Sequence, residues 1–533
     1  MQGAVVVTGN SRLAAVLQQE FQQQAVDNGQ TVWESPAIKP WNIWLNQLWE
    51  DAVFDGRIES PALLLTEAQE QYVWESVIES LTVAILRKEA TASKVSEAWR
   101  QLINWQVRCD EADFDLNEDT QAFTLWVDEF EQQCNEQGWQ SLARMAEQLV
   151  QCFNDDTATP ESEILLLGFD ELTPLQLALC TAINNHGGSI LWAELAQANQ
   201  PGHTAIRLAC TDNDDEICTL AQWIQQRLER QPDAQIGVVV PDLGAHRSRL
   251  IRRLTELLVP CNLVSEDEEP LPWNISLGLP LKSYPVIEAA FSVLELAGGS
   301  FQLERLVPLL NSPYLAGASE EVGSRSLLDR KLREIGEQRV SLQSLCWQAG
   351  RTETPWHSPQ LAGHVCKLAK LVKDVPGSAS TADWVKWFIE ILNTAGWTKD
   401  RNFNAAEYQA IEAFHKLLAR FSGLQAVSGR LSYSRALNLL RRLAHSQIFQ
   451  PRTDSTPIQI LGLYEAIGIQ FDALWVMDLH DNNWPASPQP NPFIPLSLQR
   501  KLSMPHADQA RERFIAQRST ERMLLAAPDV GMS

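Results

Sequence analysis

Acidic residues beside an apolar run and an arginine-rich stretch are residues of this 533-residue chain whose types could do chemistry. Asp170 and Glu171 follow the apolar run ILLL, and Arg518 lies in the polar stretch QARERFIAQRSTER. Enzymes that transfer a phosphoryl group hold the phosphates with cations and with magnesium that is bound by carboxylates. The chain contains no Gly-Lys dipeptide, so the phosphate loop G-x-x-x-x-G-K-[ST] cannot be written anywhere in it. The sequence therefore lacks the loop that normally cradles a phosphate.

The segment 457–485, PIQILGLYEAIGIQFDALWVMDLHDNNWP, predicts two buried strands with polar loops at their ends. The first strand is expected over Ile458–Leu463 and the second over Ala473–Met477, with a Glu-Ala-Ile-Gly turn between them. Short apolar runs that are bounded by Gly and Pro are typical of strands covered on both faces. In open α/β sheets ligands bind beyond the carboxyl ends of such strands.

Composition predicts a well-buried globular chain outside the membrane. Hydrophobic residues make up 45% of the sequence, and no apolar run or leader pattern predicts a membrane span or signal peptide, so we expect a cytoplasmic protein. Nine cysteines are scattered without a C-x-x-C pair, which argues against a zinc ribbon, an iron–sulfur cluster or a disulfide framework. We expect buried free thiols.

A net charge of −24 limits how the chain could bind nucleic acid, because a globally acidic surface repels phosphate. Two interpretations stay open. A local groove could be basic, or another domain or a partner could hold the DNA.

The periodicity predicts an α/β fold with two parallel-sheet domains, each interrupted by a mainly helical insertion. Strands are expected at 4–9, 163–169, 189–195, 206–210 and 235–240, with helices at Ser11–Gln24, Thr173–Ile183 and from about Glu216. A helical stretch from Ser60, with Pro61 in its first turn, to about 152 forms the first insertion, and a terminal strand is expected at 523–528. In the second insertion Ser380 and Asn404 are predicted to cap helices. The predicted domain parts are 1–55 and 156–230 for the first sheet, 56–155 for its insertion, 231–274 and 451–533 for the second sheet, and 275–450 for its insertion.

Four segments resemble the UvrD/RecB-like superfamily 1 helicases, and more closely the AddB-type branch, in which one helicase-like half can be inactive. They are YEAIGIQFDALWVMDLHDNNWP (464–485), QARERFIAQRSTERMLLAAP (509–528), LLLGFDELTPLQ (165–176) and VVVTGNSRLAAVL (5–17). The last of these resembles the segment that follows the phosphate loop and touches single-stranded DNA. The resemblance implies two RecA-like domains of the P-loop NTPase type.

The same resemblance implies a degenerate nucleotide site. Arg518 falls on the arginine that reaches the γ-phosphate in active members, whereas Gln470 stands where they carry a ribose-binding Glu. Asp170 and Glu171 sit three residues late for the magnesium-binding pair. We therefore expect Arg518 and Gln470 to be vestigial, and we expect no catalytic residue, cofactor or metal. One hypothesis is that Arg518 now serves as an ion-pair partner of Asp170 or Glu171. No nuclease site is expected either, because the single D-x-K, Asp329 to Lys331, falls in a helix where i,i+4 ion pairs explain it.

Three places are candidates for contact with nucleic acid, and each has a structural alternative. Asn10, Ser11 and Arg12 could contact phosphate at a helix N-terminus or simply cap the helix. Arg247 and Arg249, with Arg252 and Arg253, could line a groove or be solvated. Trp484 could stack on a base or plug a domain interface. The acidic run 212–216 is expected to cap a helix rather than to bind a metal.

These observations predict a helicase-like, ATPase-inactive module of a bacterial DNA double-strand-break repair or recombination protein. It would bind or guide DNA, single-stranded in our expectation, for a RecB-type nuclease domain or an AddA/RecB-like helicase–nuclease subunit. Two alternatives stay open: a protein–protein scaffold without DNA contact, and an active ATP-dependent helicase with a nonstandard nucleotide site.

Overall fold

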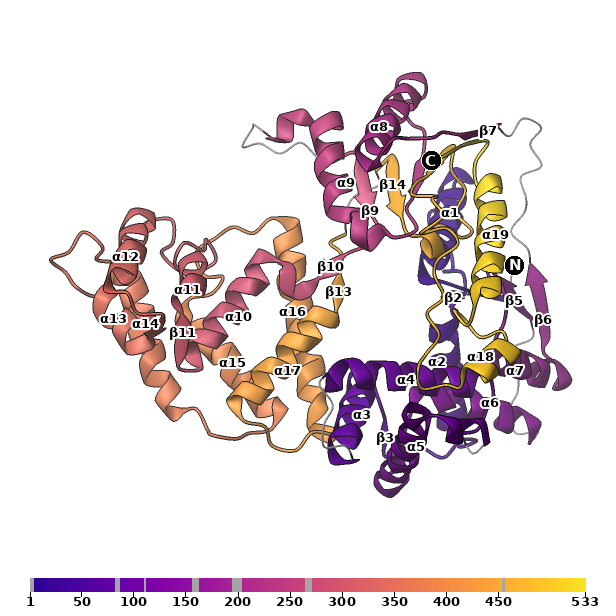
Figure 1. Cartoon of the computed structure of the whole chain (residues 1–533), viewed down its shortest axis with the longest axis horizontal. Coiled ribbons are helices and arrows are strands. Elements are labelled where there is room, and N and C mark those ends of the chain that lie inside the picture. Colours follow the sequence, from indigo (N-terminus) through magenta and orange to yellow (C-terminus); the bar gives the residue numbers. More distant parts are fainter. Residues whose placement is uncertain are drawn as a thin grey trace. The chain divides into compact units, whose positions relative to one another are not determined.

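The computed structural model describes residues 4–81, 87–109, 112–155, 163–193, 204–263, 271–452 and 456–533 (Figure 1). The chain folds into two compact units. The first consists of Met1–Leu277 and Asp454–Ser533, and the second of Gly278–Thr453. The first unit contains both large sheets, and the second is mainly helical.

The first sheet has four parallel strands, in the order β2 (Ile38–Pro40), β1 (Ala4–Thr8), β5 (Glu163–Leu167) and β6 (Ser189–Ala193). Residues along β1 alternate between two cores, as the pleat requires. Val5 and Val7 pack with the helices of one face, which are α2 (Trp41–Phe54), α6 (Met145–Asn154) and α7 (Pro174–Asn185). Val6 faces α1 (Ser11–Asp27) on the other side.

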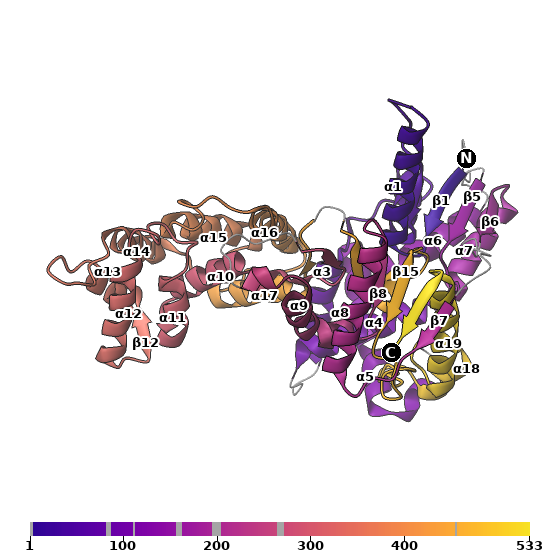
Figure 2. The same ribbon diagram turned by 90° about the horizontal axis from the view of Figure 1, so that it is seen from above.

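The second sheet has six parallel strands, in the order β7 (Thr204–Arg207), β16 (Asp529–Met532), β15 (Ala473–Val476), β8 (Ile236–Val239), β14 (Ile458–Leu461) and β9 (Trp273–Ile275). Helices α8 (Asn213–Arg230) and α9 (Leu243–Leu258) cover one face, and α19 (Gln509–Leu525) covers the other (Figure 2). Trp475 points to α8 and α9, while Leu474 and Val476 point to α19. The α/β class with two parallel sheets is thus confirmed.

Two predictions about these sheets are wrong. Residues 204–230 were assigned to the first sheet, but β7 pairs with β16 and α8 packs on the second sheet, so both elements belong to the second sheet. A strand–helix pattern does not reveal which sheet the strand joins. The strand predicted at 523–528 is also misplaced, because α19 continues to Leu525 and β16 begins at Asp529.

The remaining part of the first unit is a helical layer with an aromatic core. Its members are β3 (Leu63–Leu64), α3 (Glu67–Leu81), α4 (Lys88–Asn104), α5 (Glu118–Gln137), β4 (Trp139–Gln140) and, near the C-terminus, α18 (Leu496–Lys501). Trp74 stacks on Phe130 at 3.9 Å between ring centroids. The helix start predicted at Ser60 is wrong. Thr66 and Gln69 bond reciprocally at the start of α3, which leaves 60–66 free of helix.

The second unit packs eight helices: α10 (Pro285–Ala297), α11 (Leu303–Leu310), α12 (Val322–Ile335), α13 (Leu342–Ala349), α14 (Pro359–Leu371), α15 (Thr381–Ala395), α16 (Ala405–Gly423) and α17 (Tyr433–Ser446). Short strand pairs join β10 (Leu279–Pro280) to β13 (Ile448–Phe449) and β11 (Ser300–Gln302) to β12 (Arg339–Ser341). The predicted caps Ser380 and Asn404 are confirmed, because each side chain accepts a hydrogen bond from a backbone N–H in the first turn of its helix.

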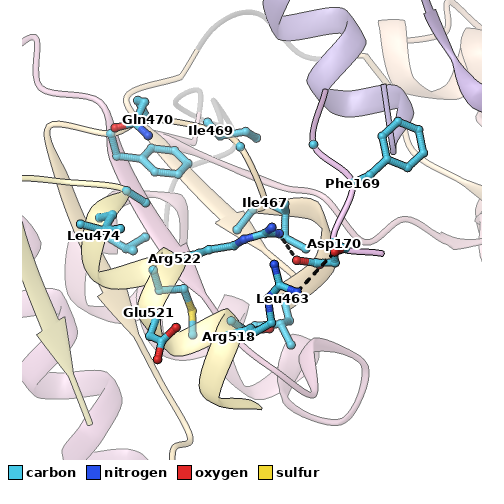
Figure 3. A pocket seen from close by; sticks show the side chains of 18 of the residues that line it. Phe169, Asp170, Leu463, Ile467, Ile469, Gln470, Leu474, Arg518, Glu521 and Arg522 are labelled. Atoms are coloured by element: carbon cyan, nitrogen blue, oxygen red, sulfur yellow. Dashed lines mark hydrogen bonds and ion pairs between the residues drawn. The ribbon is translucent and has the colours of Figure 1, made fainter. Parts of the chain in front are cut away.

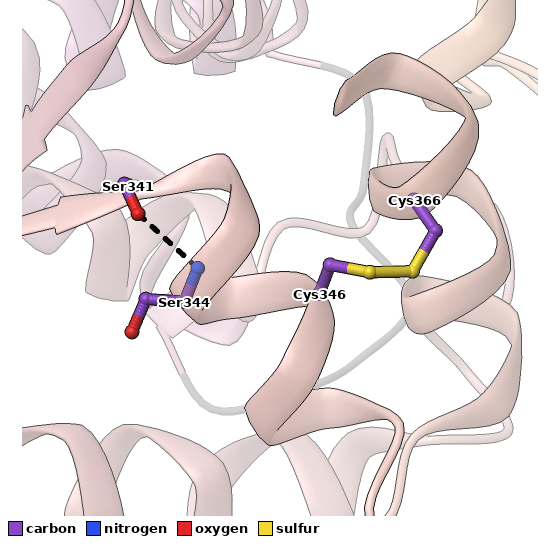
Figure 4. The surroundings of a disulfide bond; sticks show 4 residues. All are labelled: Ser341, Ser344, Cys346 and Cys366. Carbon is purple, nitrogen blue, oxygen red and sulfur yellow. Dashed lines mark hydrogen bonds between the residues drawn. A yellow bond between two sulfur atoms is a disulfide. The ribbon is translucent and has the colours of Figure 1, made fainter. Parts of the chain in front are cut away.

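A disulfide within the second unit contradicts the prediction that the cysteines are free. Cys346 on α13 is bonded to Cys366 on α14, and their Cα atoms are 5.2 Å apart (Figure 4). Ser341 caps α13 by accepting a hydrogen bond from the backbone N–H of Ser344. The bond therefore joins two adjacent helices, and the separation of 20 residues between the two cysteines gave no indication of the pairing.

Within the ranges that the structure describes, no helix combines the length and hydrophobicity needed to cross a bilayer.

Candidate functional site

A cavity of about 290 Å³ lies in the first unit, beyond the carboxyl ends of β5 and β6 (Figure 3). Its walls come mainly from three segments of the sequence, and Trp192 and Ala193 of β6 complete them. Gly168 to Asp170 follow β5, residues 466–471 follow β14, and α19 supplies Arg518 and Arg522. These are three of the four segments that carry the helicase resemblance, and the cavity also includes Gln470, which is exposed.

The fourth segment, the corner between β1 and α1, is too short to be a phosphate loop. Gly9 and Asn10 alone separate Thr8 from Ser11, whereas the phosphate loop has about eight residues. Gly9 donates a backbone hydrogen bond to the Leu167 carbonyl oxygen at 3.0 Å. A Cβ atom on Gly9 would lie under 3.0 Å from the carbonyl oxygen of Gly168, closer than real Cβ atoms come. The corner is thus packed directly on the end of β5.

The three candidate residues at this corner serve α1. The Oδ1 atom of Asn10 accepts a hydrogen bond from the Leu13 N–H at 2.7 Å, so Asn10 is the N-cap, as the structural alternative predicted. Ser11 is exposed in the first turn. Arg12 donates to the Oε1 atom of Gln459 on β14 at 2.8 Å and so ties α1 to the second sheet. Burial lowers the pKa of Arg12, and nearby Glu465 opposes that shift.

Three arginines on one side of α19 contact Asp170 and Glu171. Arg511, Arg518 and Arg522 are spaced by seven and four residues, which places them on one side of the helix. Arg522 forms an ion pair with Asp170, and Arg511 forms one with Glu171. Arg518 donates from Nη1 to the backbone oxygen of Asp170 at 3.4 Å. The hypothesis that Arg518 is the ion-pair partner is therefore wrong, since its helical neighbours take that role.

The ion pair with Arg511 also changes the titration of its carboxylate. The hydrogen bond from Arg511 lowers the pKa of Glu171 below its ordinary value of 4.5, and partial burial opposes this. Figure 3 shows Arg518 and Arg522 pointing towards Asp170 from the same helix. Arg518 and Arg522 in the cavity wall thus bind oxygen atoms of Asp170.

The arginines of α9 are engaged with their own neighbours. Arg249 forms an ion pair with Asp214 at 3.0 Å, and Arg253 forms one with Glu256 at 2.6 Å. Arg247 donates to the Leu277 carbonyl oxygen at 3.0 Å. Arg252, 68% exposed, is near Glu256 at 3.9 Å. These contacts favour solvated or paired surface charges over a basic groove.

Trp484 and the acidic run 212–216 both contact neighbouring residues within the first unit. The indole N–H of Trp484 donates to the hydroxyl of Thr520 on α19 at 3.1 Å, and the ring packs against the core between α19 and the second sheet. Asp212 caps α8 by accepting hydrogen bonds from the N–H groups of Asp214 and Asp215. In the part of the chain that the structure describes, no group of three or more His, Cys, Asp or Glu residues is placed to hold a metal ion.

One buried acidic cluster was not predicted. Asp478, directly after β15, is 4% exposed and has a φ of 61°, which is rare for a residue other than glycine. Its carboxylate lies 3.3 Å from Nε2 of His246 and 3.1 Å from Nε2 of His480. Its backbone N–H donates to buried Glu216 at 2.9 Å. The polar sequence HDNN (480–483), which follows a buried strand, is the sequence feature that could have indicated this cluster.

Comparisons with known proteins add no family assignment. Neither the scan of protein-family models nor the search of curated proteins finds a match to this chain.

Proposed function

We propose that this chain is a helicase-like module without ATPase activity that binds or guides DNA in a bacterial repair or recombination protein. It would act with a RecB-type nuclease domain or with a helicase–nuclease partner subunit. The proposal rests on the four resembling segments, and on the short β1–α1 corner.

The β1–α1 corner is the observation that supports an inactive ATPase. Phosphoryl transfer relies on backbone N–H groups, a lysine and Mg²⁺ arranged around the β- and γ-phosphates. Here two residues make the turn, the sequence supplies no Gly-Lys, and Gly9 is packed on Gly168. The corner therefore contains no phosphate loop, and its contact with Gly168 leaves no room for a loop that could surround a triphosphate.

The carboxylates give independent support. Asp170 and Glu171 are the acidic residues nearest the position expected for a magnesium-binding pair, and both are occupied by arginines of α19. A carboxylate held by a guanidinium is less available to a metal ion, because the two cations compete for the same oxygen atoms.

The experiment is a paired measurement of ATP turnover and DNA binding on the full chain. We expect no ATP hydrolysis above background with or without single-stranded DNA, and modest DNA binding that weakens steeply with added salt. An active superfamily 1 helicase assayed in parallel is the control. Turnover that single-stranded DNA stimulates and that Arg518→Ala abolishes would contradict the proposal.

A protein–protein scaffold without DNA contact is the second candidate. It is favoured by the net charge of −24 and by the ion pairs of Arg249 and Arg253, which reduce the positive charge that α9 can offer to DNA. The same binding assay separates the two, because a scaffold would show no DNA binding even at low salt.

A further inference from the structure

Charge is distributed very unevenly between the two units. The second unit, Gly278–Thr453, contains 21 Lys and Arg against 15 Asp and Glu, a net charge of +6. The rest of the chain contains 22 basic and 52 acidic residues, a net charge of −30. The acidic balance of the whole chain therefore conceals a basic unit, and a polyanion would meet the least repulsion there.

A shallow hollow of about 410 Å³ in the second unit gathers part of this positive charge. It lies between α14 and α15, which run side by side (Figure 2). Its lining residues are His364 and Lys367 from α14, Lys386, Ile389, Glu390, Asn393 and Thr394 from α15, and Lys399 from the segment that follows.

The lysines of the hollow are available to a ligand. Lys367, Lys386 and Lys399 are all exposed. Lys386 is 2.9 Å from Asp383, but its side chain is 78% exposed, so the pair is weak. Among the described residues no ion pair is recorded for Lys367 or Lys399, in contrast to the paired arginines of α9 and α19.

The acidic residues near the hollow do not cancel this charge. Glu390 is the one carboxylate among the residues that line it. Asp400, next to Lys399, turns its Oδ2 atom to the backbone N–H of Gly317 at 3.1 Å. His364 uses Nδ1 to contact the Thr394 carbonyl oxygen at 2.8 Å, which fixes the ring in the floor of the hollow. Three lysines against one lining carboxylate leave a net positive surface.

We propose that this lysine-lined hollow binds the sugar–phosphate backbone of DNA, an inference that rests on the function proposed above. Lysine ammonium groups supply sequence-independent contacts to phosphate oxygens. The amide of Asn393 adds a further donor, and Ile389, 36% exposed, offers an apolar contact for a sugar. Two more exposed lysines extend this surface, Lys370 on α14 and Lys373 in the 3₁₀ turn Val372–Asp374 that follows it.

The proposal places DNA on the helical unit rather than on the arginine helices of the α/β unit. Ion pairs would have to break before a phosphate could meet Arg249 or Arg253 on α9, or Arg511 or Arg522 on α19, and no such pair is found in the described part of the chain for Lys367 or Lys399. The surrounding charge also favours the second unit, since +6 attracts a phosphate chain and −30 repels it.

The test removes the three lysines together and compares the result with a matched loss of charge elsewhere in the same unit. The test variant of the full chain is Lys367→Gln/Lys386→Gln/Lys399→Gln. The control variant is Arg330→Gln/Arg333→Gln/Lys416→Gln, which removes three exposed cations that are paired with acids on their own helices, α12 and α16. Binding of fluorescent single-stranded and duplex oligonucleotides is measured over a salt series, and thermal melting verifies that all proteins are folded.

We expect the test variant to bind DNA at least about tenfold more weakly at low salt, with a salt slope smaller by about 2 for single strands. The control variant should keep the wild-type affinity within about twofold. Wild-type binding that the test variant retains would overturn the lysine hollow while leaving the proposed function intact. Absence of binding by the wild-type chain would instead overturn the proposed function, and the hollow with it.

Discussion

Substituting Gly9 with alanine tests the close contact between the β1–α1 corner and the end of β5. The backbone of Gly9 lies against the Gly168 carbonyl group, and an added Cβ would come under 3.0 Å from that oxygen atom. Both partners are backbone atoms at the ends of paired strands, so neither can rotate away as a side chain would. Overpacking of this kind costs about 1–3 kcal/mol. We therefore expect Gly9→Ala to lower the melting temperature of the first unit, by about 2 °C per kcal/mol.

Gly244→Ala is the matched control, because it makes the same change in the same unit with the opposite expected sign. Gly244 lies in the first turn of α9, and its added Cβ would meet atoms no nearer than 3.6 Å. Alanine in a helix is more stable than glycine by up to about 1 kcal/mol. Calorimetry of both variants is the assay. If Gly9→Ala melts at or above the wild-type temperature, the two strand ends are not in contact and the reasoning about the corner fails.

Three further changes probe the Cys346–Cys366 disulfide, the Arg511–Glu171 ion pair and the hydrogen bond of Trp484 to Thr520. Cys346→Ser should destabilise the second unit by about 3 kcal/mol, the value for closing a loop of about 20 residues, and a reductant should lower the melting temperature of the wild type but not of this variant. Because the pKa of Glu171 is lowered, mainly by Arg511, its stabilisation should be complete above about pH 4.5 and be lost as the pH falls through the lower folded value, so the stability difference between wild type and Glu171→Gln should shrink in acid. Trp484→Phe should cost about 1 kcal/mol through its lost hydrogen bond, without changing DNA affinity; weaker DNA binding at unchanged stability would identify a base contact instead.

Local signals in the sequence predicted the central strands and several caps. The strands expected at Ile458–Leu463 and Ala473–Met477 are found at Ile458–Leu461 and Ala473–Val476, because short apolar runs bounded by glycine and polar residues leave few other conformations. Asn404 is found as the cap of α16, with Glu407 bonding back to its N–H. Each of these features is decided within a few residues of chain.

Features decided by distant residues were not predicted. The assignment of β7 depends on its pairing with β16 at the other end of the chain, and nothing in residues 204–207 indicates that partner. The Cys346–Cys366 bond likewise depends on the packing of α13 against α14. The ion pairs of Asp170 and Glu171 required the position of α19, although the spacing of Arg511, Arg518 and Arg522 was visible in the sequence.

The magnitudes indicate which feature closes the candidate nucleotide site. The ion pairs that Arg522 and Arg511 make with Asp170 and Glu171 are partly exposed, with side-chain exposures between 17% and 43%, and such pairs are worth about 0–1 kcal/mol. A bound triphosphate could displace them at small cost. The two-residue corner at Gly9 is different, because making room for a phosphate loop requires moving the ends of two paired strands. Freeing the arginines, for example with Asp170→Ala, should therefore not produce ATP turnover, since the missing element is the loop and not the cations.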